Sequence, residues 1–114
     1  MVIINQTRNA VLGKEVSVAH RIFPRIRGLL GRRNFRTGEA IILKPCNSIH
    51  TFFMRFPIDC LFVDKNYRVI KALSNIRSFR ITRIYWLSNF AVELPAGTLE
   101  FTHTQENDML TIIP

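Results

Sequence analysis

The residues best suited to chemistry lie in one apolar stretch, residues 44–64, with the sequence KPCNSIHTFFMRFPIDCLFVD. It contains both cysteines, one of the three histidines and an aspartate surrounded by apolar neighbours. An acidic side chain in such surroundings must be hydrogen-bonded, paired with a cation or protonated. We expect Asp59 to be held by Arg55 or by backbone N–H groups of the Phe56-Pro57 turn between them.

The same polar side chains also predict a binding pocket. Ligand pockets are mostly apolar and contain a few converging polar groups. The acid of the segment VELPAG adds a second carboxylate to those of the apolar stretch. The side chains expected to contact a ligand are His50, Met54, Arg55, Asp59 and Glu93. We therefore predict a small non-catalytic binding module with its pocket near a hairpin at residues 48–59, and a small polar ligand or a protein as its partner.

A hydrolase-type enzyme is an alternative use of two of these residues. If Asp59 and Glu93 approached each other, one of them could stay protonated and act as a general acid, as in hydrolases with paired carboxylates. Residue types alone do not bring the two groups together. We assign no catalytic residue from the sequence and leave open whether the chain is an enzyme.

Cys46, His50 and Cys60 are side chains that bind metals in other proteins. A structural zinc site needs four ligands, commonly as close cysteine pairs, and the sequence contains no C-x-x-C. Two small buried thiols and one hydrogen-bonded histidine explain the same residues. We expect no metal and no cofactor.

The net charge of +8 makes nucleic acid a second alternative partner. Basic residues concentrate in residues 21–36 and 77–83, where neighbouring aromatic side chains could stack on bases. The arginines of the first segment that would contact nucleic acid are Arg21, Arg25, Arg32, Arg33 and Arg36. A solvated basic surface that keeps the chain soluble explains the charge equally well, and no recognised nucleic-acid motif occurs.

The elements that would position these residues are mainly strands. Short runs rich in β-branched and aromatic residues, separated by turn residues, predict strands. The expected strands cover residues 1–5, 10–12, 39–43, 49–54, 58–63, 68–73, 81–87, 90–94 and 109–113. Apolar spacing from residue 18 to 30 predicts a short basic helix that starts near Pro24 and stops at Gly31, and residues 96–101 predict one helical turn. The fold class expected is mainly β (α+β), a compact antiparallel barrel-like sheet with one or two short helices.

A chain of 114 residues has room for one modest core, so we expect a single domain over residues 1–114. No stretch resembles an export signal, and none approaches the ~20 apolar residues of a membrane helix. Two cysteines are too few for a disulfide-stabilised secreted domain. We expect a cytoplasmic protein with reduced thiols and no membrane span, as a monomer or a homodimer.

Three segments together resemble the family called domain of unknown function one-nine-two, also labelled ACR, for ancient conserved region. They are RGLLGR (residues 27–32), PCNSIHTFFMRFPIDCLFVD (residues 45–64) and VELPAGT (residues 92–98). The resemblance covers about residues 16–112. It implies a compact, mainly β, barrel-like fold with a short helix, and it implies no catalytic residue, cofactor or substrate. The sequence differs from the family pattern at Asn66-Tyr67 and at Asn107, where the family usually has glycine.

Overall fold

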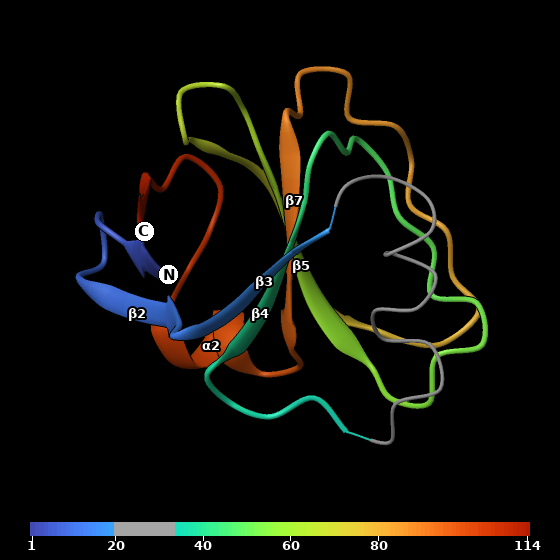
Figure 1. The fold of residues 1–114 in the computed structure, drawn as a ribbon. Helices are drawn as coiled ribbons and strands as arrows, with labels where there is room; N and C mark the ends of the chain where they lie inside the picture. Colours follow the sequence, from blue (N-terminus) through green and yellow to red (C-terminus); the bar gives the residue numbers. More distant parts are fainter. Residues whose placement is uncertain (20–33) are drawn as a thin grey trace.

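The computed structural model describes residues 1–19 and 34–114, which form two β-sheets and one short helix (Figure 1). The three-stranded sheet has the order β2-β1-β8, with strands β1 (Val2–Asn5), β2 (Ala10–Gly13) and β8 (Leu110–Ile113). The five-stranded sheet has the order β3-β4-β7-β5-β6, with strands β3 (Glu15–Ala19), β4 (Glu39–Leu43), β5 (Ile58–Val63), β6 (Val69–Ile76) and β7 (Phe90–Pro95). The helix is α2 (Thr98–Thr102). The mainly β fold class predicted from the sequence is confirmed.

Strands β5 and β7 are the centre of the larger sheet, and every residue of both is buried. Their sequences, IDCLFV and FAVELP, are apolar at almost every position rather than at alternate positions, which is typical of strands covered on both faces. Residues 58–63 were predicted to be such a strand, and this is confirmed.

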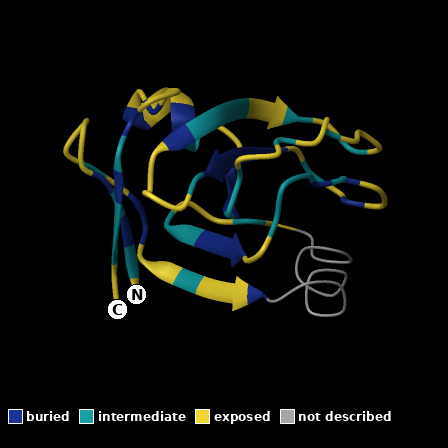
Figure 2. Cartoon of the chain, turned by 90° about the horizontal axis from the view of Figure 1, so that it is seen from above, coloured by how far each residue is buried: buried dark blue, intermediate teal, exposed yellow. Residues whose placement is uncertain are grey.

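A separate hydrophobic core covers each face of the larger sheet. The first core lies against the three-stranded sheet and α2, and it includes Ile3, Leu61, Val92 and Leu99. The second core lies on the opposite face, where the loop after β4 contributes Ile49 and Met54 against Ile58, Cys60 and Phe62. Figures 1 and 2 place the three-stranded sheet and α2 at one end of the molecule, and the loops that follow β4 and β6 at the other end.

The observed sheets differ from the prediction in two features. Residues 15–19 form strand β3, which was not predicted, and β3 pairs in parallel with β4 where an antiparallel sheet was expected. Parallel neighbours need a connection of about a dozen residues or more, and the chain from residue 20 to 38 supplies one. The described strands also form two separate sheets and not a closed barrel. The basic helix predicted near residues 24–31 lies outside the described residues.

The strands predicted at residues 49–54 and 81–87 are instead irregular segments that run beside each other. One isolated bridge joins His50 to Ile81, and single backbone bonds join Thr82 to Ile49 and Tyr85 to Asn47. Regular pairing fails because the backbone turns within each segment and because the Thr82 hydroxyl accepts the Ile49 N–H. Ile49 and Met54 do pack in the second core, but several other apolar residues of these segments, such as Phe53 and Ile81, are exposed.

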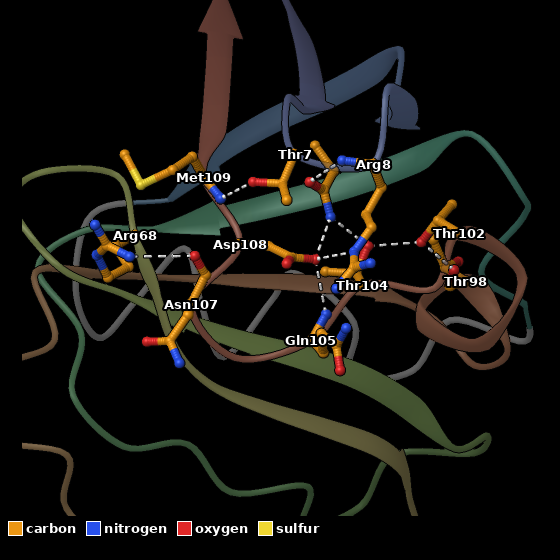
Figure 3. A network of polar contacts seen from close by, with 11 residues as sticks. Thr7, Arg8, Arg68, Thr98, Thr102, Thr104, Gln105, Asn107, Asp108 and Met109 are labelled. Atoms are coloured by element: carbon orange, nitrogen blue, oxygen red, sulfur yellow. Dashed lines mark hydrogen bonds and ion pairs between the residues drawn. The ribbon is translucent and has the colours of Figure 1, made fainter.

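Residues 5, 104, 105 and 108 form a polar network that fastens the last loop of the chain to β1 (Figure 3). The Asp108 carboxylate accepts from Asn5 Nδ2 at 2.9 Å, from the Gln105 N–H at 3.0 Å and from Arg8 Nε at 3.1 Å. Burial by itself raises the pKa of Asp108, but the hydrogen bonds from Asn5, Gln105 and Arg8 outweigh that effect and leave its pKa below the ordinary value. A depressed pKa makes the ionised carboxylate a stabilising group of the folded state.

We predict that Asp108→Asn lowers the free energy of unfolding by about 1–3 kcal/mol at neutral pH, because a charged acceptor with several donors is lost. The deficit should shrink in acid, since the wild-type contribution is present above the unfolded pKa and is lost as pH falls through the lower folded pKa. Urea unfolding of both proteins from neutral to acidic pH measures this difference. Glu106→Gln is the control, because its pair with Lys71 is largely solvent-exposed and contributes little. A deficit that stayed constant down to strongly acidic pH would contradict the prediction.

Candidate functional site

The Asp59 carboxylate joins three segments of the chain and is fully buried. Its Oδ1 accepts the N–H of Asn75 at 2.8 Å, and its Oδ2 accepts the N–H groups of Gly97 at 3.1 Å and Leu99 at 2.9 Å. The expectation that backbone N–H groups hold this side chain is right in kind, but they come from β6 and from the start of α2. Arg55 and the Phe56-Pro57 turn do not provide the bonds described here.

These bonds bring together two of the segments that carry the family resemblance. Asp59 belongs to the long apolar stretch. Gly97 belongs to the segment VELPAGT, and Leu99 directly follows that segment. Gly97 has a φ of 97°, a backbone conformation that is strained for residues with a Cβ atom. The buried carboxylate therefore fixes the sharp turn between β7 and α2.

A cavity of about 580 Å³ lies on the other side of this turn. Its walls come from β2, from the corner that leads into β3, from the loop before β4 and from the β7–α2 turn with α2. They consist of Val11, Leu12, Gly13, Lys14, Thr37, Gly38, Ala96, Gly97, Thr98, Phe101 and Thr102. Most of the surface that lines the cavity is apolar.

Two features of the lining keep the cavity open. Gly38 and Gly97 both have positive φ, and no heavy atom lies within 4 Å of the place where a Cβ would stand on either residue. The Phe101 ring, which is 86% exposed, is held out beside them on α2. Sequence reasoning missed this cavity, because a phenylalanine usually indicates burial and nothing in the residue types shows that Phe101 is exposed.

The predicted pocket residues do not all meet. In the pairing of β5 with β7, Asp59 lies opposite Leu94 and Cys60 lies opposite Glu93. Because neighbouring residues of a strand point to opposite faces, Asp59 and Glu93 lie on opposite faces of the sheet. The paired-carboxylate arrangement that the hydrolase alternative needs is therefore not formed.

The other predicted pocket residues lie in the loop between β4 and β5. Met54 is buried in the second core, on the face of the sheet that Glu93 shares. His50 stacks on Phe52 with 5.0 Å between ring centroids, and its Nδ1 accepts the Phe52 N–H at 3.3 Å. Arg55 is exposed. A ligand contact by His50, Met54, Arg55 and Glu93 stays a prediction for that face.

Thr51 connects the two loops at this end of the molecule. Its hydroxyl donates to the Arg77 carbonyl at 2.6 Å and accepts the Arg80 N–H at 3.0 Å. Its backbone N–H donates to the Arg80 carbonyl at 2.9 Å, and its carbonyl accepts the Phe79 N–H at 3.1 Å. The side chain is buried, so the two loops are held as one unit.

Of the arginines predicted to contact nucleic acid, the structure describes Arg36. Arg36 is exposed, and its N–H donates to Glu39 Oε2 at 2.8 Å. Arg21, Arg25, Arg32 and Arg33 lie outside the described residues, so the basic segment predicted to bind nucleic acid stays a prediction. Within residues 1–19 and 34–114, no group of three or more His, Cys, Asp or Glu side chains is arranged to hold a metal ion. No helix in this part of the chain is long and apolar enough to cross a bilayer.

Comparison with known proteins identifies relatives over nearly the whole chain. The model of the DUF192 family, described as an uncharacterized ACR, matches residues 2–112. A UPF0127 protein of Thermococcus sibiricus is 29% identical over 110 residues, covering 93% of this chain and 71% of that protein. The UPF0127 protein PH1112 of Pyrococcus horikoshii is 29% identical over 112 residues, covering 95% of this chain and 96% of that protein.

The fold is also found in a solved structure, that of a protein of unknown function from Novosphingobium aromaticivorans. It matches with a TM-score of 0.82 at 14% identity, covering 97% of this chain and 82% of that chain. The chain belongs to the DUF192 family, as its three motifs predicted. The names of these relatives state no activity.

We predict that Asp59→Asn lowers the free energy of unfolding by about 1–3 kcal/mol, because an amide has one acceptor oxygen and cannot serve donors on both sides. Asp64→Asn is the matched control, since Oδ1 alone accepts the N–H groups of Asn66 and Arg68. The control should stay within about 0.5 kcal/mol of wild type. Urea unfolding measures both, and equal losses would show that Asp59 does not act through its two oxygens.

We also predict that Thr51→Val loosens the two loops, whereas Thr51→Ser preserves them. Valine keeps the shape of threonine but leaves the Arg77 carbonyl and the Arg80 N–H without their partner, at a cost of about 1–3 kcal/mol. Hydrogen exchange at the amides of residues 79 and 80 measures the opening of the loops. Equal protection of these amides in the valine and serine variants would show that the Thr51 hydroxyl does not hold the two loops together.

Proposed function

We propose that the chain is a non-catalytic binding module and that its ligand occupies the cavity beside α2. The observation that supports this most directly is the open, mostly apolar cavity of about 580 Å³. Its volume lies in the range of small-molecule sites, roughly 300–1,000 Å³. Exposure of a whole phenylalanine ring beside it is unfavourable in water, and a bound apolar ligand would cover that ring.

The polar groups of the lining favour a ligand with an apolar body and one anionic group. Among the lining residues that the structure describes, Lys14 alone has a basic side chain. The hydroxyls of Thr98 and Thr102 already donate to the carbonyls of Pro95 and Thr98. Among the described residues that line the cavity there is no carboxylate, imidazole or thiol. The lining therefore supports binding better than proton-transfer chemistry.

The proposal keeps the binding module predicted from the sequence but moves its site. Asp59 acts as a positioning residue, since its carboxylate holds the amide of Gly97 in the cavity wall. We also propose that the chain is a single domain, because one family model matches residues 2–112. The proposal also includes a cytoplasmic location, because two cysteines are too few for a disulfide-stabilised secreted domain.

The test uses anilinonaphthalene sulfonate, an apolar dye with one anionic group, as the probe ligand. We expect saturable binding with amide shifts at Gly38 and Gly97 in NMR spectra. Ala96→Trp should fill the cavity and weaken binding by about tenfold or more, equivalent to ~1.4 kcal/mol. Lys14→Ala should weaken binding of the dye but not of its uncharged analogue.

Phe79→Ala is the control, because that exposed side chain belongs to the loop after β6, and Figures 1 and 2 place this loop at the end of the molecule opposite α2. It should bind the dye as the wild type does. Circular dichroism verifies that each variant is folded. Unchanged affinity in a folded Ala96→Trp variant, or shifts confined to other amides, would overturn the cavity as the site.

A further inference from the structure

Three phenylalanines cluster on the two loops that Thr51 connects. The rings of Phe53 and Phe79 meet edge to face with 5.4 Å between centroids, and Phe52 lies 6.3 Å from Phe79. Phe53 is 72% exposed, Phe79 59% and the neighbouring Ile81 73%. These four residues are called the aromatic tip below. A contiguous apolar surface of this kind on a soluble domain marks a site of interaction.

The backbone presents two of these rings in an unfavourable conformation. Phe53 and Phe79 have φ values of 64° and 60°, in the left-handed region that favours glycine. Holding a bulky residue there costs roughly 1–2 kcal/mol. The cost is offset by the Thr51 bonds and by Ser78 Oγ, which donates to the Met54 carbonyl. Such strain persists where the surrounding structure fixes it, and it is concentrated at functional sites.

The charged side chains of the two loops themselves, residues 44–57 and 77–89, are all basic. Arg55, Arg77, Arg80 and Arg83 are exposed on the same two loops or next to them. Residues 40–58 and 65–92 contain no aspartate or glutamate, so no acid in these stretches neutralises the arginines. The partner that complements this surface is anionic.

Several backbone amides of these loops are already hydrogen-bonded within the protein. The amides of Thr51, Met54, Phe79 and Arg80 all donate to acceptors within these loops. Nonpolar surroundings penalise unbonded N–H and C=O groups by several kcal/mol, so internally bonded loops can enter such surroundings at lower cost.

We propose that the aromatic tip docks on an anionic phospholipid bilayer, with Phe53 and Phe79 in the interface and the arginines on lipid phosphates. Aromatic rings favour the headgroup region, and basic residues gain from anionic lipids. A single-stranded nucleic acid fits less well, because these rings pack edge to face on each other instead of forming an open stacking row. The aromatic tip and α2 lie at opposite ends of the molecule, so the cavity stays accessible when the tip is docked (Figures 1 and 2).

The test measures co-sedimentation of the whole chain with phosphatidylcholine vesicles, with and without phosphatidylserine. We expect binding only with phosphatidylserine, weakened by added salt. The variant Phe53→Gly/Phe79→Gly should bind about tenfold more weakly or worse, since each buried ring contributes a factor of that order. Glycine adopts positive φ without strain, so this variant should remain folded.

Phe101→Ala is the matched control, because it removes an even more exposed ring at the far end of the molecule. It should bind vesicles as the wild type does. A second measurement uses Phe53→Trp with Trp86→Phe, which leaves a single tryptophan in the aromatic tip. Its emission should shift to the blue with phosphatidylserine vesicles and stay unchanged with phosphatidylcholine alone.

Other outcomes would overturn the proposal. They include no binding to either vesicle, equal binding to both, or an equal loss in the Phe101→Ala control. A fluorescent single-stranded oligothymidine is titrated in parallel. Tight oligothymidine binding that the glycine variant loses, without vesicle binding, would assign the surface to nucleic acid instead.

Discussion

The buried carboxylate of Asp59 is the constraint on which the rest of the structure depends. It is fully buried in the larger sheet, and burying a carboxylate is costly unless its oxygens accept hydrogen bonds. The donors are backbone N–H groups of Asn75, Gly97 and Leu99, so β5, β6 and α2 must assemble together. One side chain thus fixes both the extension of β6 and the turn that forms a wall of the cavity.

The larger sheet separates the molecule into two ends with different chemistry. On one face, the three-stranded sheet and α2 cover a core and leave a mostly apolar cavity beside Gly97. On the other face, the loops after β4 and β6 cover a second core and end in exposed aromatic rings among arginines. The two proposed sites share no residue. Each depends on a buried polar group that forms hydrogen bonds with the backbone, Asp59 in one case and Thr51 in the other.

Much of the fold could be predicted because its signals are local. The apolar composition predicted strands β4, β5 and β7, and three sequence motifs predicted the family. The parallel pairing of β3 with β4 could not be predicted, because it depends on a distant connection and not on the composition of either strand. The partners of Asp59 were also missed, because every residue except proline has a backbone N–H and residue types do not show which of them will donate. The glycine differences at Tyr67 and Asn107 were informative, because both residues adopt positive φ.

The pairing of β1 with β8 has a consequence for how the chain folds during synthesis. β1 pairs with the nearby β2 on one side, but Val2 lies opposite Ile113 on the other, so the ladder of β1 with β8 must wait until that distant strand is made. Contacts between such distant residues slow folding, and a chain emerging from the ribosome exposes its unpaired strands until they meet. The apolar residues of β1, including the fully buried Ile3, would therefore be a natural target for a chaperone during translation.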